Sequence, residues 1–171
     1  LTKIIKWPDV VQRHYLDSLS VILAVPSLYQ GGEKVLDVGS GFGMPGFPLS
    51  IIFPRNNFLL LESVGKKHTF MNSVIKKMHL SNVETVLGRA EDLAKDGHYR
   101  ESYSLVVSRA VAPLPVLLEF TLPFCSVGGV VVAMKGSGVE SEIRQSTQSL
   151  KLLGGEIEKV VSVAGKLPYS E

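Results

Sequence analysis

Residues 35–46 have the sequence VLDVGSGFGMPG, and this stretch decides the fold. A short apolar run, typical of a buried strand, leads directly into glycines at alternate positions. We expect a helix to begin near Pro45 or Gly46. Glycines at this point allow a tight turn and a close approach of the backbone to a ligand. The pattern alone also fits an ordinary turn, but an acidic residue about 20 positions further on favours a nucleotide-type site.

Apolar runs and helical patterns alternate through the rest of the chain. Buried strands are expected at 34–38, 58–61, 83–87, 105–107 and 130–134, with helical spacing clearest at 64–78 and 114–122. This alternation predicts an α/β fold of the Rossmann-like class, a parallel sheet flanked by helices on both faces. Near the N-terminus, Asp9 followed by Gln12 resembles a capping box that opens a helix, and Pro26 should close it.

Length and composition indicate one globular domain. The 171 residues are 45% apolar and 20% charged, so we expect a helical part over 1–30 and a core over 31–171. No run approaches the roughly 18 apolar residues of a membrane span. The single cysteine, Cys125, indicates a reducing compartment and hence the cytoplasm. A net charge of +2 neither requires nor excludes a nucleic-acid partner.

Two cofactor classes use such a glycine turn, and the charge beside it separates them. A dinucleotide presents an anionic pyrophosphate, which prefers bare helix N–H groups. Asp37 closes the strand and would repel that group, whereas S-adenosylmethionine carries a cationic sulfonium and ammonium. A charge pair about 4 Å apart is worth on the order of 4 kcal/mol at an effective dielectric near 20, before desolvation. The sequence therefore favours the methyl donor, with a NAD-dependent oxidoreductase as the alternative.

Other polar residues follow the remaining strands. Glu62 ends the second strand, where a carboxylate can accept both ribose hydroxyls of either cofactor. Ala90-Glu91 follows the third strand, where an adenine would lie, although an acidic first turn of a helix fits equally. Arg109 and Lys135 follow the fourth and fifth strands and should project over the carboxyl edge beside the donor.

The helix after Glu62 begins with two lysines. Lys66 and Lys67 stand in its first turn, where cations are disfavoured by roughly 0.3–1 kcal/mol. A residue placed against local preference indicates a function, here a phosphate contact, and two solvated lysines are the alternative. The four histidines show no metal-ligand spacing, so no metal is expected.

Several motifs in order resemble one family. They are Arg13-His14, Asp17-Ser18, the glycine stretch from Asp37 to Gly46, Glu62-Ser63 with Lys66-Lys67, Arg89-Ala90-Glu91, Ser108-Arg109-Ala110-Val111-Ala112 and Lys135-Gly136. Together they resemble the 16S ribosomal RNA guanine-N7 methyltransferases, the glucose-inhibited division protein B family. The resemblance runs from the first residues to about Gly136 and becomes vague beyond it.

The resemblance implies a class I methyltransferase fold with an N-terminal helical extension. It implies S-adenosylmethionine as donor and 16S ribosomal RNA or the small subunit as partner. We expect a monomer. The candidate donor-binding residues are Asp37, Gly39, Ser40, Gly41, Gly43, Met44, Glu62, Ser63, Val64, Ala90, Glu91 and Arg109. The candidate RNA-binding residues are Lys66, Lys67 and Lys135. Met44 stands where many relatives have Phe.

The resemblance also implies a chain shortened at both ends. Relatives have an Asn-Leu-Thr run preceded by more helix where this sequence starts at Leu1-Thr2. They also continue into a last strand and a basic tail. Both ends therefore differ from the family pattern.

The implied chemistry needs no general base. Guanine N7 is a lone pair on the Hoogsteen edge, and no proton leaves it when it attacks a sulfonium methyl group. Alignment of the reactants can supply roughly 7–11 kcal/mol, and Arg109 would position the base. Alternatives are a methyltransferase of small molecules or proteins and a non-catalytic RNA-binding module.

Overall fold

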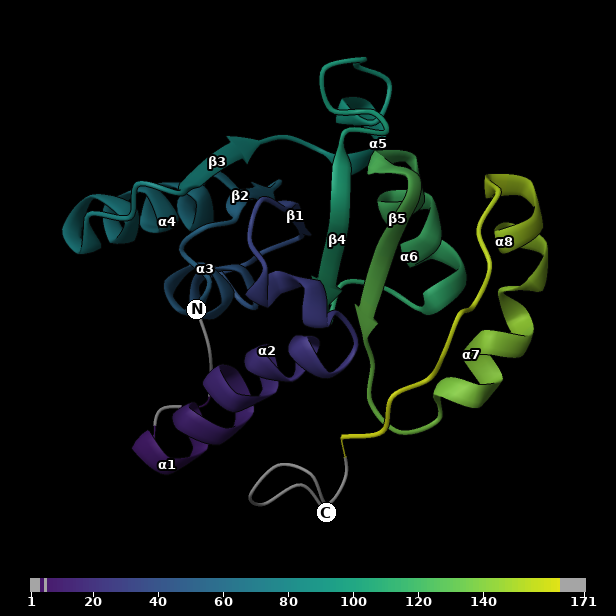
Figure 1. The fold of residues 1–171 in the computed structure, drawn as a ribbon, viewed down its shortest axis with the longest axis horizontal. Coiled ribbons are helices and arrows are strands. Elements are labelled where there is room, and N and C mark those ends of the chain that lie inside the picture. Colours follow the sequence, from purple (N-terminus) through teal and green to yellow (C-terminus); the bar gives the residue numbers. More distant parts are fainter. Residues whose placement is uncertain (1–3, 5, 164–171) are drawn as a thin grey trace.

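The computed structural model describes residue 4 and residues 6–163, and it contains a five-stranded parallel sheet. The strand order is β3-β2-β1-β4-β5 (Figure 1). The strands are β1 Lys34–Val38, β2 Asn57–Glu62, β3 Val83–Leu87, β4 Tyr103–Arg109 and β5 Cys125–Met134. All neighbouring pairs are parallel. The predicted α/β class is therefore confirmed.

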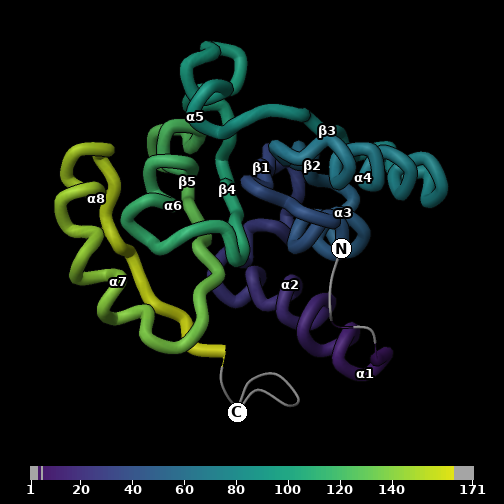
Figure 2. The backbone as a smooth tube through the Cα atoms, turned by 180° about the vertical axis from the view of Figure 1, so that it is seen from behind, coloured from purple at the N-terminus to yellow at the C-terminus, as the bar shows by residue number. Residues whose placement is uncertain are grey.

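Helices connect the strands and cover both faces of the sheet. They are α3 Gly46–Ile52, α4 Gly65–Met78, α5 Ala90–Leu93, α6 Leu114–Thr121 and the 3-10 turn η4 Leu122–Phe124. After β5 come α7 Val139–Gln145 and α8 Thr147–Leu153. Figure 2, seen from behind, places α4 and α8 at opposite ends of the molecule. No described helix is long and apolar enough to cross a membrane.

Strand alternation divides the core into two layers. Val35, Leu60 and Val107 pack on one face with α3, α4 and the N-terminal segment. Leu36 and Val106 pack on the other face, which also holds Phe124. Because side chains alternate along a strand, every second residue of β1, β2 and β4 points to the same layer. This parity also decides where the residues at the strand ends point.

The N-terminal segment departs from the expected single helix. It comprises α1 Trp7–Val10, a π-helical turn η1 Val11–Leu16, α2 Asp17–Leu19 and the 3-10 turn η2 Ser20–Leu23. The capping box at Asp9 was a wrong prediction, because Lys6 is the N-cap and no side chain bonds to the helix start. Asp9 lies inside the first turn. Pro26 begins a further 3-10 turn, η3 Pro26–Tyr29, rather than closing a helix directly.

Strands β4 and β5 are longer than their apolar runs. β5 begins at Cys125 and includes Gly128 and Gly129, and the pairing of Tyr103 and Leu105 with β5 contains a register shift. Backbone pairing does not depend on an apolar side chain, so hydrophobicity alone marked only the most apolar part of each strand.

Candidate active site

Three charged residues meet at the carboxyl edge of the sheet because of strand parity. Asp37, Glu62 and Arg109 stand an even number of positions from Val35, Leu60 and Val107, so they share the face that holds α3 and the N-terminal segment. β1 pairs with β2 on one side and β4 on the other. This is the point where the chain reverses its direction across the sheet, the usual ligand position in open α/β folds.

The glycine loop after β1 is held by hydrogen bonds of its own. The N–H groups of Gly39 and Ser40 both donate to the Leu61 carbonyl, at 2.9 and 3.0 Å. Those of Gly43 and Met44 donate to the Ser40 carbonyl, at 2.8 and 3.0 Å. The backbone donors of this loop are thus largely consumed within the protein.

The start of α3 has no N–H to offer an anion. The Gly46 N–H donates to Asp37 Oδ2 at 2.9 Å, and the Phe47 N–H donates to the Gly43 carbonyl at 2.8 Å. Pro45 and Pro48 have no N–H. A pyrophosphate would therefore lack the bare donors that a dinucleotide site provides. The geometry counts against the oxidoreductase alternative.

Asp37 is fully buried and carries an oxygen suited to a cationic or donor group. Its Oδ1 is the single buried side-chain polar atom among the described residues without a hydrogen-bond partner. Burial raises the pKa of Asp37 to about 7, and the Gly46 N–H opposes that rise. A cation beside the carboxyl would lower this pKa. The positive charge of an ammonium or sulfonium at this loop thus suits the ionised form of Asp37.

Gly41, whose N–H donates to Glu62 Oε2, leaves open space at the loop. A Cβ built on Gly41 meets nothing closer than the Gly39 carbonyl oxygen at 4.0 Å, whereas a Cβ on Gly43 would overlap the Phe47 ring at 2.0 Å. Gly43 therefore serves close packing, while Gly41 leaves the backbone open to a ligand. Both residues have positive φ, +63° and +95°.

The Glu62 carboxylate accepts hydrogen bonds from the backbone on both sides of it, and so stabilises the glycine loop. Its Oε2 accepts the Gly41 N–H and its Oε1 accepts the Val64 N–H, both at 2.8 Å. Each carboxylate oxygen keeps a second lone pair for a ribose hydroxyl. The sequence did not reveal this support role, although the strand-end parity of Glu62 with Leu60 was a signal for it.

The expected adenine region lies beside Glu62. Arg89 caps α5, so Ala90 and Glu91 form its first turn. The Gly88 N–H donates to the Glu62 carbonyl at 3.0 Å, which joins the ends of β3 and β2. Ala90 is half-buried and Glu91 is exposed. Ser63 and Val64, also exposed, leave β2 at the same edge.

Arg109 lies against the N-terminal segment, an arrangement that the sequence did not predict. Its Nη1 donates to Asp17 Oδ2 at 2.8 Å and to the Arg13 carbonyl at 3.0 Å. Its Nη2 lies 3.2 Å from Nδ1 of His14. Only 15% of the Arg109 side chain is exposed. Residues 13–17 are thus part of the site.

The lysines fall into two groups. Lys66 is exposed at the start of α4, and Lys67 Nζ lies 3.7 Å from Glu62 Oε2. Lys135 does not project over the carboxyl edge beside Arg109, as its position after β5 suggested. Its Nζ bonds to the Ala112 carbonyl at 2.9 Å and to Glu142 Oε2 at 2.7 Å.

Parity explains the placement of Lys135. Arg109 and Met134 are register partners and point to the same face, so the next residue, Lys135, points to the face of α6 and α7. The sequence could reveal this only together with the register of β4 and β5. A phosphate contact of Lys135 stays a prediction, and it would have to compete with Glu142.

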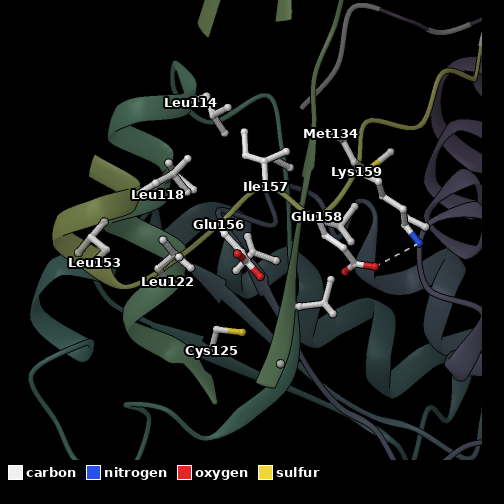
Figure 3. Close-up of a pocket in the computed structure, with 18 of the residues that line it drawn as sticks. Leu114, Leu118, Leu122, Cys125, Met134, Leu153, Glu156, Ile157, Glu158 and Lys159 are labelled. Carbon is white, nitrogen blue, oxygen red and sulfur yellow. Dashed lines mark ion pairs between the residues drawn. The ribbon is translucent and has the colours of Figure 1, made fainter. Parts of the chain in front are cut away.

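A cavity runs along β5, at the edge of the sheet. A space of about 950 Å³ follows β5 and the segment after α8, and its walls include Leu118, Leu153 and Ile157 (Figure 3). Asp17 and Lys135 are among the residues that line it, whereas the glycine loop, Glu62 and Ala90-Glu91 do not. Its mainly aliphatic walls differ from the polar strand edge described above. The polar groups that could hold a donor therefore lie at the glycine loop and the strand ends beside it.

Comparisons with known proteins agree on one family. The family model described as GidB, rRNA small subunit methyltransferase G, matches residues 1–168. The ribosomal RNA small subunit methyltransferase G of Thermoanaerobacter sp. (strain X514) is 48% identical over 171 residues, which cover all of this chain and 70% of that protein. The protein of the same name from Dehalococcoides mccartyi (strain CBDB1) is 47% identical over 163 residues, 95% of this chain and 68% of the relative.

Solved structures agree on the fold. Fibrillarin of Aeropyrum pernix, solved with natively bound S-adenosyl-L-methionine, has a TM-score of 0.65 at 20% identity and covers 88% of this chain and 68% of its own. A SAM-dependent methyltransferase from Aquifex aeolicus has a TM-score of 0.65 at 19% identity, covering 94% and 89%. These two likenesses concern the fold alone, whereas the sequence matches are far closer. The chain therefore belongs to the GidB family, rRNA small subunit methyltransferase G.

Proposed function

We propose that this protein transfers the methyl group of S-adenosylmethionine to N7 of a guanine in 16S ribosomal RNA of the small subunit. One observation carries the choice of donor. The buried Asp37 Oδ1 has no partner within the described chain, and it lies at a loop whose N–H groups are consumed internally. The family supplies the substrate class, since its members are named for methylation of small-subunit ribosomal RNA.

The residues at the strand ends would each contact a different part of the donor. Asp37 would hold the cationic end of the donor, and Gly39, Ser40, Gly41, Gly43 and Met44 would shape the backbone around it. Glu62, with Ser63 and Val64, would hold the ribose. Ala90 and Glu91 would flank the adenine.

Arg109 would position the acceptor base. When bound, S-adenosylmethionine supplies an electrophilic methyl group on a sulfonium. The attacking N7 lone pair loses no proton, so no side chain needs to act as a base. A guanidinium bonded to N7 itself would block the lone pair, so Arg109 acts through guanine O6 or a neighbouring phosphate. Lys66, Lys67 and Lys135 would contact RNA phosphates.

Methyl transfer from labelled S-adenosylmethionine to unmodified small subunits and to free 16S RNA tests the proposal. Digested RNA should contain labelled 7-methylguanosine. Label in a protein or a small molecule, with none in RNA, would instead support a different methyltransferase. Calorimetric titration with the donor tests the donor site separately from the substrate.

We propose that the protein is active in the cytoplasm as a monomer and requires no metal ion. Among the described residues there is no group of three or more His, Cys, Asp or Glu placed to bind a metal ion. Light scattering tests the oligomeric state, and turnover in the presence of a chelator tests the need for metal.

A further inference from the structure

The guanidinium of Arg109 is held by a segment far away in the sequence. Arg13, His14 and Asp17 lie 92 to 96 residues before it, and each contributes one acceptor. Asp17 makes the shortest contact, 2.8 Å from its Oδ2 to Nη1. A guanidinium has five N–H groups, and these contacts use three of them. Within the described part of the chain, the N–H groups on Nε and the second one on Nη2 have no protein partner.

His14 takes part as a neutral acceptor. A guanidinium can only donate, so His14 Nδ1 must be unprotonated and the ring proton must lie on Nε2. His14 is 7% exposed. Burial lowers the pKa of His14, and the positive charge of Arg109 lowers it further. Both effects favour the acceptor form.

The same segment also contacts the glycine loop. The His14 ring packs edge to face on Phe42, with centroids 5.1 Å apart. The Ser18 hydroxyl donates to the His14 carbonyl at 2.5 Å and lies 3.7 Å from the Met44 sulfur. Both Phe42 and Met44 belong to the loop that follows β1. The segment therefore links the loop to the end of β4.

We infer that Asp17 and His14 are positioning residues that hold Arg109 in the orientation required for methyl transfer. The inference rests on the proposed function for its substrate. A free arginine side chain has several rotatable bonds, and the two anchors restrict it before the substrate arrives. Asp17 fixes Nη1 through charge, and His14 fixes Nη2 through Nδ1. The two remaining N–H groups are then presented in a constant direction, which serves the alignment that this reaction needs.

A double-mutant cycle tests whether Asp17 acts through Arg109. The variants are Asp17→Asn, Arg109→Ala and the double substitution, measured for donor affinity and for kcat and KM on RNA. We expect Asp17→Asn to lower kcat on the order of tenfold to a hundredfold, since a displacement of about 1 Å can cost about 10²-fold. The double variant should be no slower than Arg109→Ala alone, because the effects of coupled residues do not add. Full additivity would overturn the inference.

Two substitutions test whether His14 acts through its acceptor atom Nδ1. In His14→Asn the side-chain oxygen can replace Nδ1 as acceptor, whereas His14→Leu removes it. Asparagine should restore most of the turnover lost in the leucine variant, and equal losses in both would contradict a positioning role. The matched control is Glu33→Gln at the opposite edge of the sheet, where Glu33 Oε2 accepts from Ser104. That control should change neither kcat nor donor affinity.

Failure of this inference and failure of the proposed function give different results in these experiments. Absence of RNA methylation by the unsubstituted protein would refute the substrate, and the same cycle would then be scored on donor affinity. Coupling of Asp17 and His14 to Arg109 in donor binding would support the positioning role, and its absence there would refute it. Thermal unfolding of each variant identifies any that fails to fold, and the isosteric Asp17→Asn then carries the test.

Discussion

Replacing Asp37 with asparagine should stabilise the fold at neutral pH while weakening donor binding. Asp37 is completely buried and uses one oxygen, Oδ2, to accept the Gly46 N–H. Burial raises its pKa from 3.8 to about 7. The folded protein thus binds this proton more tightly than the unfolded chain. Stability is therefore lost as the pH rises from 3.8 through about 7.

The size of the effect follows from the shift. About three pKa units, at about 1.36 kcal/mol per unit, correspond to a cost of about 4 kcal/mol well above pH 7. At pH 5 the unfolded carboxyl has passed only about one unit beyond its pKa, so the cost is about 2 kcal/mol. Asparagine never ionises and escapes this cost, although its buried amide adds a pH-independent penalty of roughly 1–3 kcal/mol. The unfolding free energy of the asparagine variant minus that of the wild type should thus increase by about 2–3 kcal/mol from pH 5 to pH 8.

Urea denaturation of both proteins at pH 5, 6, 7 and 8 measures this difference in unfolding free energy. Other groups that titrate alike in both proteins contribute equally to the two free energies, so their contributions cancel in the difference. Calorimetry in the same buffers should show wild-type affinity for S-adenosylmethionine rising through pH 7, since a cation binds the ionised carboxyl. The asparagine variant should bind weakly at every pH. A stability difference that stays constant from pH 5 to pH 8 would refute the role assigned to burial at Asp37.

Two further predictions concern packing and RNA. Gly46→Ala should destabilise the protein by about 1–3 kcal/mol, because the new Cβ would lie 2.2 Å from a Leu60 methyl carbon. The control is Gly97→Ala, whose Cβ meets nothing within 4 Å. Equal unfolding midpoints for the two variants would contradict the packing argument. Lys66→Glu should weaken RNA binding and reduce the salt slope of log K by about 1 or more, with donor affinity unchanged. Lys34→Glu, at the exposed first residue of β1 and so at the opposite end of the strands, should leave the salt slope unchanged.

The fold was predictable because it rests on local signals. The apolar runs at 34–38 and 83–87 match β1 and β3, and the helical spacing at 64–78 matches α4 to within a residue. The family resemblance was also confirmed. The donor-site and RNA-site residues stay predictions, since no comparison tests them.

The placement of side chains at the strand ends was less predictable. Asp37, Glu62 and Arg109 gather because of parity within each strand, which the sequence contains. Strand parity also separates Lys135 from Arg109, but only once the register of β4 and β5 is known. The contacts of Arg109 with Asp17 depend on how the N-terminal segment packs on the sheet. Its π-helical turn has no signature in hydrophobic spacing, so a sequence pattern could not indicate it.

The long separation between Asp17 and Arg109 also sets the order of events during synthesis. β1 lies between β2 and β4, so the first strand completes its pairing only after the fourth has been made. Ninety-two residues separate Asp17 from Arg109, a delay of about 5–18 seconds at about 5–20 residues per second. For the later part of that interval the nascent chain has its glycine loop but not the arginine that Asp17 binds. A step that depends on Arg109 therefore cannot begin before β4 has been made and has paired with β1.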